Sequence, residues 1–211
     1  MFLRHEMREY IFQYVKESPR IFSPVWEKIS AAKIDCVSFS PNAVNPMTTA
    51  KGIYSDTGLT VLFKSNEKNA LARYKGVNER PWTDSCVEIF FNPSPDASDK
   101  YFNFELSAGG GLLIGYGEGR EDRLRCDFEL DIFDIETDIK PDGWMAKLTI
   151  PFSFVLGYAK EFRDVFAGNF QKCGDETQNP HFVVWNEIKN KVPDFHKPEF
   201  FGKFILGRKK N

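Results

Sequence analysis

Carboxylates in two predicted strands are the residues of this sequence best placed for acid–base chemistry. Glu88 lies in the segment 85–92 (SCVEIFFN) and Glu105 in the segment 101–107 (YFNFELS). A pair of carboxylates can cleave a glycosidic bond, one as the acid and the other as base or nucleophile. A single carboxylate can instead hydrogen-bond a ligand hydroxyl. The pair leaves open both a sugar-active enzyme and a sugar-binding protein.

Other familiar catalytic motifs are missing from the sequence. It contains no GxGxxG, GxxxxGK[ST], GxSxG or HExxH pattern. A Ser-His-Asp or Cys-His site would have to use His181 or His196, and neither has a recognisable catalytic setting. A haem protein with Met and His ligands is a third alternative. It is disfavoured because no methionine in a predicted loop lies near such a histidine.

The cysteines and the acidic residues are the candidate metal ligands. The four cysteines are 40 or more residues apart and match no zinc spacing, so we expect unpaired thiols (Cys36, Cys86, Cys126, Cys173). A run of alternating acidic residues could bind calcium, which prefers several oxygen ligands, or could form a solvated strand face (Asp127, Glu129, Asp131, Asp134, Glu136, Asp138). Calcium as a structural ion stays possible.

Aromatic residues are the other chemically informative group. Phe accounts for 21 of 211 residues, and aromatics together make up 15%. Aromatic side chains fill cores and also form flat platforms for sugars. Trp82 follows Pro81 in a predicted loop, which favours exposure. By contrast, Trp144 and Trp185 lie in apolar runs, and Trp26 lies in a short helix, so these three are predicted to be core residues.

The charge balance limits the partners. The formal net charge is −2, which provides no basic surface for nucleic acid or anionic lipid, so we expect neither partner. No stretch of about 18 apolar residues could cross a bilayer. The first ten residues lack the apolar core of a secretory signal, which predicts either a cytoplasmic protein or a chain whose leader has been removed.

Period-2 alternation dominates the elements that must position these side chains. Segments such as 58–65, 85–92, 101–107 and 143–150 alternate and end at turn residues. This pattern predicts an all-β fold, a single antiparallel β-sandwich of jelly-roll or immunoglobulin-like type. One or two short helices are expected, near 24–32 and 151–158. Residues 1–211 are read as one domain, with 1–20 as an N-terminal extension.

Three segments in this order resemble carbohydrate-binding module family 9 and its family 9-like relatives. They are 80–91 (RPWTDSCVEIFF), 101–105 (YFNFE), and 184–186 (VWN) followed by 193–202 (PDFHKPEFFG). The resemblance extends over about 26–206. It implies a non-catalytic β-sandwich, often attached to xylanases, in which two aromatics clamp a sugar at a chain end and calcium stabilises the fold.

The resemblance also implies roles for individual residues. Trp82 matches the first clamp aromatic, and Phe195 lies where a second clamp tryptophan is expected. Glu88 and Gln171 match a carboxylate and an amide in the sugar slot, whereas Asn103 lies where the family can place an arginine. His196 is next to Phe195 and is a further candidate. We therefore expect a module that holds the end of a plant-type polysaccharide or oligosaccharide, such as xylan or cellulose. The alternative is a glycoside hydrolase using Glu88 and Glu105.

Overall fold

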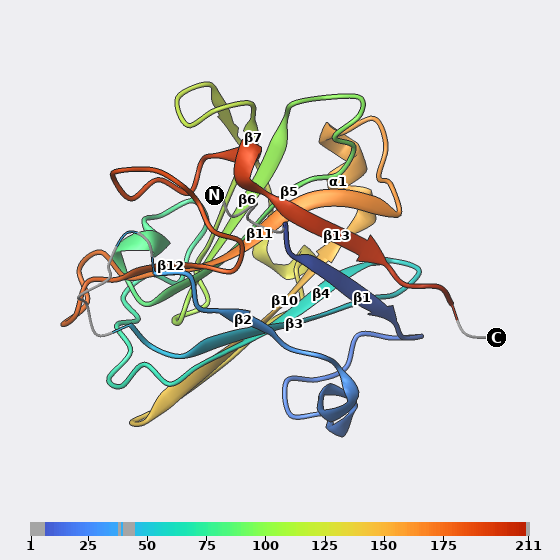
Figure 1. Cartoon of the computed structure of the whole chain (residues 1–211). Helices are drawn as coiled ribbons and strands as arrows, with labels where there is room; N and C mark the ends of the chain where they lie inside the picture. The colour runs from blue at the N-terminus through green and yellow to red at the C-terminus, as the bar shows by residue number, and fades with distance from the viewer. Residues whose placement is uncertain (1–6, 38, 40–44, 210–211) are drawn as a thin grey trace, which may run out of the picture.

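The alternating segments form the strands of the computed structural model, which describes residues 7–37, 39 and 45–209 (Figure 1). Within these residues the strands are β1 (Glu9–Tyr14), β2 (Ala32–Ile34), β3 (Thr48–Tyr54), β4 (Gly58–Ser65), β5 (Cys86–Asn92), β6 (Tyr101–Ser107), β7 (Leu112–Gly117), β8 (Arg123–Arg125), β9 (Ile135–Lys140), β10 (Gly143–Pro151), β11 (Val165–Cys173), β12 (Phe182–Val184) and β13 (Gly202–Leu206). The predicted all-β sandwich is confirmed.

The strands form two layers that share one strand. One layer has the order β8-β7-β6-β5-β11-β13-β1, and the other has the order β1-β3-β4-β10-β9; β12 pairs with β11, and β2 pairs with β3. In β1, residues 9–12 pair with β13 and residues 13–14 pair with β3. The first half of β1 therefore belongs to one layer and its end to the other, and Figure 1 shows β1 beside β13.

The sheet is mixed, which corrects the expectation of a purely antiparallel sandwich. Both pairings of β1 are parallel, while the other strand pairs are antiparallel in the described part of the chain. A period-2 pattern is the same in parallel and antiparallel strands, so the sequence does not distinguish them. Part of the segment that was expected to be an extension, 1–20, is thus a strand between two others.

Helical segments are short, as expected. The chain forms four 3₁₀ helices and one α-helix in its described residues: η1 (Pro24–Lys28), η2 (Pro81–Thr83), η3 (Leu130–Ile132), η4 (Pro198–Phe200) and α1 (Phe152–Tyr158). Ser23 caps η1 by accepting a hydrogen bond from the Val25 amide at 3.3 Å. Helix η1 ends at Lys28, before the predicted boundary at residue 32, because Ile29 is extended. Among the described residues, none of the helices has the length and apolar character that a membrane span requires.

The space between the two layers is filled by aromatic side chains. Phe12, Phe170 and Phe204 are fully buried there, and their rings lie 4.8–6.2 Å apart. Trp144 and Trp185 belong to the same core, and Trp26 is buried beneath η1, as expected for all three. Most of the aromatic content therefore serves packing, which directs attention to the few aromatic rings outside this core.

The acidic run is partly neutralised by a buried lysine. Lys147 on β10 is fully buried, and its Nζ lies 2.6 Å from Asp134 and 2.5 Å from Glu136. Arg20 also pairs with Glu136 at 2.8 Å. In the part of the chain that the structure describes, no member of the run belongs to a group of three close metal ligands. Asp134 and Glu136 therefore link β9 and the residue before it to β10 through ion pairs with Lys147.

Candidate functional site

Strand alternation divides β5 and β6 into a core face and an outer face. Val87, Ile89 and Phe91 of β5 point into the core between the layers, so Glu88 must point to the opposite face. On β6, Phe102 and its alternate neighbours face the core in the same way. The strand register then places Glu88 opposite Glu105 and Phe90 opposite Asn103. The two strands thus present a polar row on the outer face of the sandwich.

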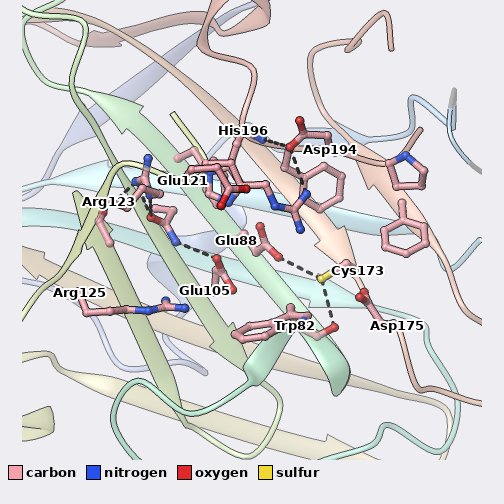
Figure 2. A pocket seen from close by; sticks show the side chains of 17 residues that line it. Trp82, Glu88, Glu105, Glu121, Arg123, Arg125, Cys173, Asp175, Asp194 and His196 are labelled. Carbon is pink, nitrogen blue, oxygen red and sulfur yellow. Dashed lines mark hydrogen bonds and ion pairs between the residues drawn. The ribbon is translucent and has the colours of Figure 1, made fainter. Parts of the chain in front are cut away.

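A pocket of about 360 Å³ lies over this polar row. Its walls come from η2, the strands β5, β6, β7, β8, β11 and β12, and connecting segments that include 193–196. It is lined by Trp82, Glu88, Phe90, Asn103, Glu105, Gly115, Arg120, Glu121, Arg123, Arg125, Cys173, Asp175, Phe182, Pro193, Asp194, Phe195 and His196. Figure 2 shows Trp82 at one end of this group, Asp194 and His196 at the opposite end, and the two glutamates between them.

Five of the six residues expected in the site line this pocket together. They are Trp82, Glu88, Asn103, Phe195 and His196. The structure does not bring the sixth residue, Gln171, to the pocket surface. Its side chain is fully buried where β11 is paired on both sides, with β5 and with β12, and in its hydrogen-bonding orientation its amide nitrogen donates to backbone carbonyls. The pocket thus reaches β11 at Cys173, two residues further along, but not at Gln171.

The two expected clamp aromatics differ in how much of each ring is free. Trp82 lies on η2 and is partly exposed, with the guanidinium groups of Arg80 and Arg125 at 5.8 and 6.0 Å from its ring. Phe195 is only 8% exposed and packs against Phe39 and Phe182. Trp82 can therefore offer a face to a ligand, whereas Phe195 contributes a limited edge.

The backbone that carries Trp82 is held by hydrogen bonds on both sides of η2. The buried carboxylate of Asp84 accepts hydrogen bonds from the Arg73 amide, from the Arg73 guanidinium at 2.7 Å and from the Tyr74 amide at 2.9 Å. The carbonyl of Trp82 accepts from the Asp175 amide at 3.2 Å. These bonds tie η2 to the segment before it and to the segment after β11, so the main chain at Trp82 has a defined position in the pocket wall.

Three arginines that follow β7, Arg120, Arg123 and Arg125, line the pocket and are among the residues that the sequence did not single out. Arg123 donates to Asn103 Oδ1 and to the carbonyls of Tyr101, Gly115 and Gly119. Its guanidinium lies 4.2 Å from the centre of the Tyr101 ring. The guanidinium of Arg123 thus reaches Asn103 from β8. The sequence feature that could have indicated these arginines is their clustering in the segment 119–125 (GREDRLR).

Burial shifts the pKa values of three side chains inside the pocket, Glu88, Glu105 and His196, toward their neutral forms. Burial raises the pKa of Glu88 well above its usual range, and the neighbouring Cys173 and Glu105 add to that rise. It raises the pKa of Glu105 to about 7, although Asn103 hydrogen-bonds this carboxylate at 2.8 Å. Burial and the nearby arginines lower the pKa of His196 to about 3. These three side chains therefore offer neutral donors and acceptors beside the arginines of the pocket wall, and both kinds of group can hydrogen-bond hydroxyl groups.

His196 is also fixed in place by its neighbours. Its Nδ1 shares a hydrogen bond of 2.9 Å with the hydroxyl of Tyr101, and its amide donates to Asp194 at 3.0 Å. The imidazole lies over Phe90, with ring centres 4.9 Å apart. Arg120 pairs with the same Asp194 at 3.5 Å. The loop carrying Phe195 and His196 is thus fastened to β6 and to the segment after β7.

The cysteines are free thiols, as expected, but two of them meet at this site. Cys86 and Cys173 lie opposite each other on β5 and β11. Together with Glu88 they form a group whose ligand atoms lie within 4.8 Å of one another. Among the described residues this is the one group of three His, Cys, Asp or Glu side chains that is close enough to hold a metal ion.

Comparison with solved structures places the fold among carbohydrate-binding proteins. A Bacteroides uniformis ATCC 8492 protein, itself only provisionally described as carbohydrate-binding, matches with a TM-score of 0.82 and 26% identity, over 95% of this chain and 100% of its own. A family 9 carbohydrate-binding module from Caldicellulosiruptor kristjanssonii in complex with cellotriose matches with a TM-score of 0.67 and 15% identity, over 97% and 96% of the two chains. The same organism's family 9 module in complex with glucose has a TM-score of 0.65 and 16% identity, over 97% and 98%.

The family assignment comes from the sequence comparison. A search of curated proteins found no match. The model of carbohydrate-binding family 9 matches residues 22–206, which is most of the chain and includes every residue that lines the pocket. That range agrees with the extent of the resemblance described above. The chain therefore belongs to carbohydrate-binding family 9.

Proposed function

We propose that this non-catalytic module binds the end of a plant-type glycan, such as a cello- or xylo-oligosaccharide, in the pocket beside Trp82. The observation that carries the proposal is the partly exposed indole at one end of a pocket whose other lining residues are mostly polar and can form hydrogen bonds. A sugar ring has an apolar C–H face for the indole and hydroxyl groups for the polar residues. The two Caldicellulosiruptor structures contain glucose and cellotriose, which supports a gluco-oligosaccharide as the first ligand to test.

The shape of the pocket favours a chain end over the middle of a polymer. The lining residues come from η2, six strands and the segments that connect them, and they converge on a single space of about 360 Å³. The loop at 193–196 is fastened across one end by the Tyr101–His196 and Arg120–Asp194 contacts. A long polysaccharide would need a groove that is open at both ends, whereas a terminal sugar needs only one entrance.

Glu88 and Glu105 have a binding role in this proposal. Both side chains belong to the outer face of one sheet and to the pocket wall. A protonated carboxyl group can donate one hydrogen bond and accept others, so Glu88 can contact two hydroxyl groups at once. Neither the family nor the solved structures support the hydrolase alternative.

The proposal is tested by titration calorimetry with glucose, cellotriose and xylotriose, followed by chromatography of the recovered sugars. We expect binding of at least one oligosaccharide and its recovery unchanged after prolonged incubation. Absence of binding to every sugar on the panel would contradict the proposal. Cleavage that disappears in Glu88→Gln and in Glu105→Gln would show that the pocket is instead a hydrolase site.

A further inference from the structure

Two thiols and a carboxylate meet at the base of the pocket. Cys173 Sγ lies 3.0 Å from Glu88 Oε1, and Cys86 Sγ lies 3.9 Å from the same oxygen. The strand register causes this meeting, because Cys86 is directly opposite Cys173 and Glu88 is two residues further along β5. Figure 2 shows the Glu88 carboxylate directed toward Cys173.

The surroundings of Glu88 provide little compensation for burying a carboxylate. Its side chain is 3% exposed. In the described part of the chain, the hydrogen bonds to its carboxylate come only from the two thiols, which are weak donors. A buried carboxylate is normally paired with a cation or with several N–H groups. Because these contacts include no positive partner, Glu88 is held in its protonated form, and three potential ligand atoms already lie within 4.8 Å of one another.

We propose that Cys86, Glu88 and Cys173 form a binding site for a soft divalent cation, with zinc as the ion that fits best. Zinc is bound by thiolates at about 2.3 Å and by carboxylate oxygens at about 2.0–2.2 Å, usually in a tetrahedral arrangement. That geometry requires ligand atoms about 3.5–4 Å apart, and the observed Sγ–Oε1 distances of 3.0 and 3.9 Å are close to this. Calcium and magnesium prefer oxygen ligands only, so the two thiols select against them.

The fourth coordination position of the ion faces the pocket. Glu88 and Cys173 both line the pocket, whereas Cys86 lies behind them. An ion held by these residues can enter from the pocket, and a water molecule or a ligand hydroxyl completes its coordination. Burial keeps the thiols protonated when no ion is bound, with the pKa of Cys86 raised to about 12. Binding therefore releases the protons of both thiols, and that of Glu88 where it is protonated, to solvent.

The test is zinc binding by the reduced full chain, measured without any sugar. The chain is treated with a chelator, its four thiols are counted by titration, and zinc is added in a calorimeter. Cobalt(II), which has visible absorption bands when bound tetrahedrally by thiolates, provides a spectroscopic readout. Cys86→Ser and Cys173→Ser each remove one ligand. Cys126→Ser is the matched control, because Cys126 is also a buried free thiol but does not line the pocket.

We expect one zinc ion per wild-type chain, with affinity reduced at least about 30-fold in Cys86→Ser and Cys173→Ser and unchanged in Cys126→Ser. The cobalt bands should appear in wild type and Cys126→Ser and be lost when both pocket cysteines are replaced. Glu88→Gln, which preserves the side-chain shape, should also weaken zinc binding. It provides a second variant if the serine variants melt early.

Three results would overturn the metal site. The first is a wild-type chain with four titratable thiols that binds no zinc. The second is zinc binding that survives in the Cys86→Ser/Cys173→Ser double variant. The third is binding that is lost equally in Cys126→Ser. Sugar binding is measured separately on the metal-free chain, so the failure of one proposal does not decide the other.

Discussion

Replacing Trp82 with alanine separates a sugar platform from a packing residue. The ring is partly exposed and lies at the margin of a small cluster that includes Phe90 and Phe195. Losing this partial burial should cost about 1–2 kcal/mol of folding stability, well below the roughly 3–5 kcal/mol of a fully buried tryptophan. If the indole stacks on the ligand, its removal should cost about 2–4 kcal/mol of binding free energy. That loss is about 30- to 1000-fold in affinity.

The assay combines thermal melting with calorimetric titration of cellotriose. Trp82→Phe keeps a smaller ring and should retain much of the affinity, while Trp82→Ala should lose it. The matched control is Phe22→Ala, because Phe22 is an aromatic residue with 67% exposure that does not line the pocket. This control should bind cellotriose as wild type does.

Two outcomes would refute the reasoning about Trp82. A folded Trp82→Ala variant with unchanged affinity would remove the indole from the binding site. A variant that melts far below wild type, as expected for Trp185→Ala, would show that the ring supports the fold instead. Trp185 is buried in the core between the layers and provides that comparison.

Three further predictions concern the groups around the pocket and the sheet. His196 has a pKa of about 3 when folded and about 6.5 when unfolded, so the unfolded chain binds more protons between these values. The free energy of unfolding should therefore fall by up to about 1.4 kcal/mol for each pH unit below pH 6.5. Between pH 7 and pH 4 the melting temperature of His196→Gln should fall less steeply than that of wild type. Arg123→Leu should lower the free energy of unfolding in urea by about 1–3 kcal/mol, because several carbonyls lose their hydrogen-bond donor. In the control variant Arg125→Ala the free energy of unfolding should stay within about 0.5 kcal/mol of the wild-type value. Lys147→Met should lower the free energy of unfolding by about 2–3 kcal/mol in urea, because it leaves carboxylates without their buried cation. An unchanged stability, or an equal loss in Lys140→Met, would contradict this prediction.

Much of the site follows from local sequence signals. Trp82 could be placed because Pro81 and the polar turn after it predict a short irregular segment before a strand. The positions of Glu88 and Asn103 on an outer face follow from the alternation of their own strands. These signals depend on neighbours within a few residues, so no knowledge of the tertiary arrangement is needed to read them.

The remaining features depend on which strands become neighbours. Arg123 reaches Asn103 only because β8 pairs with β7 at the end of the layer. The meeting of Cys86 and Cys173 depends on the β5–β11 register, which no local pattern encodes. Gln171 was expected in the slot, but its side chain is fully buried and the pocket reaches β11 only at Cys173. The sequence also does not predict the position of β1 between β13 and β3, because the alternating pattern of a strand does not identify the strands with which it pairs.

The indole resonances of the four tryptophans test the central claim most directly. In a nitrogen–proton correlation spectrum each tryptophan gives one indole signal, and only Trp82 lines the described pocket. The other three tryptophans, Trp26, Trp144 and Trp185, are buried. The indole N–H of Trp26 donates to the backbone carbonyl of Arg20, and that of Trp144 donates to the carboxylate of Glu67. During titration with cellotriose we predict that the Trp82 signal, assigned by its absence in Trp82→Phe, shifts with the sugar while the other three stay in place. A saturating titration that leaves the Trp82 signal unmoved, or that shifts the buried tryptophans instead, would contradict a sugar site in this pocket.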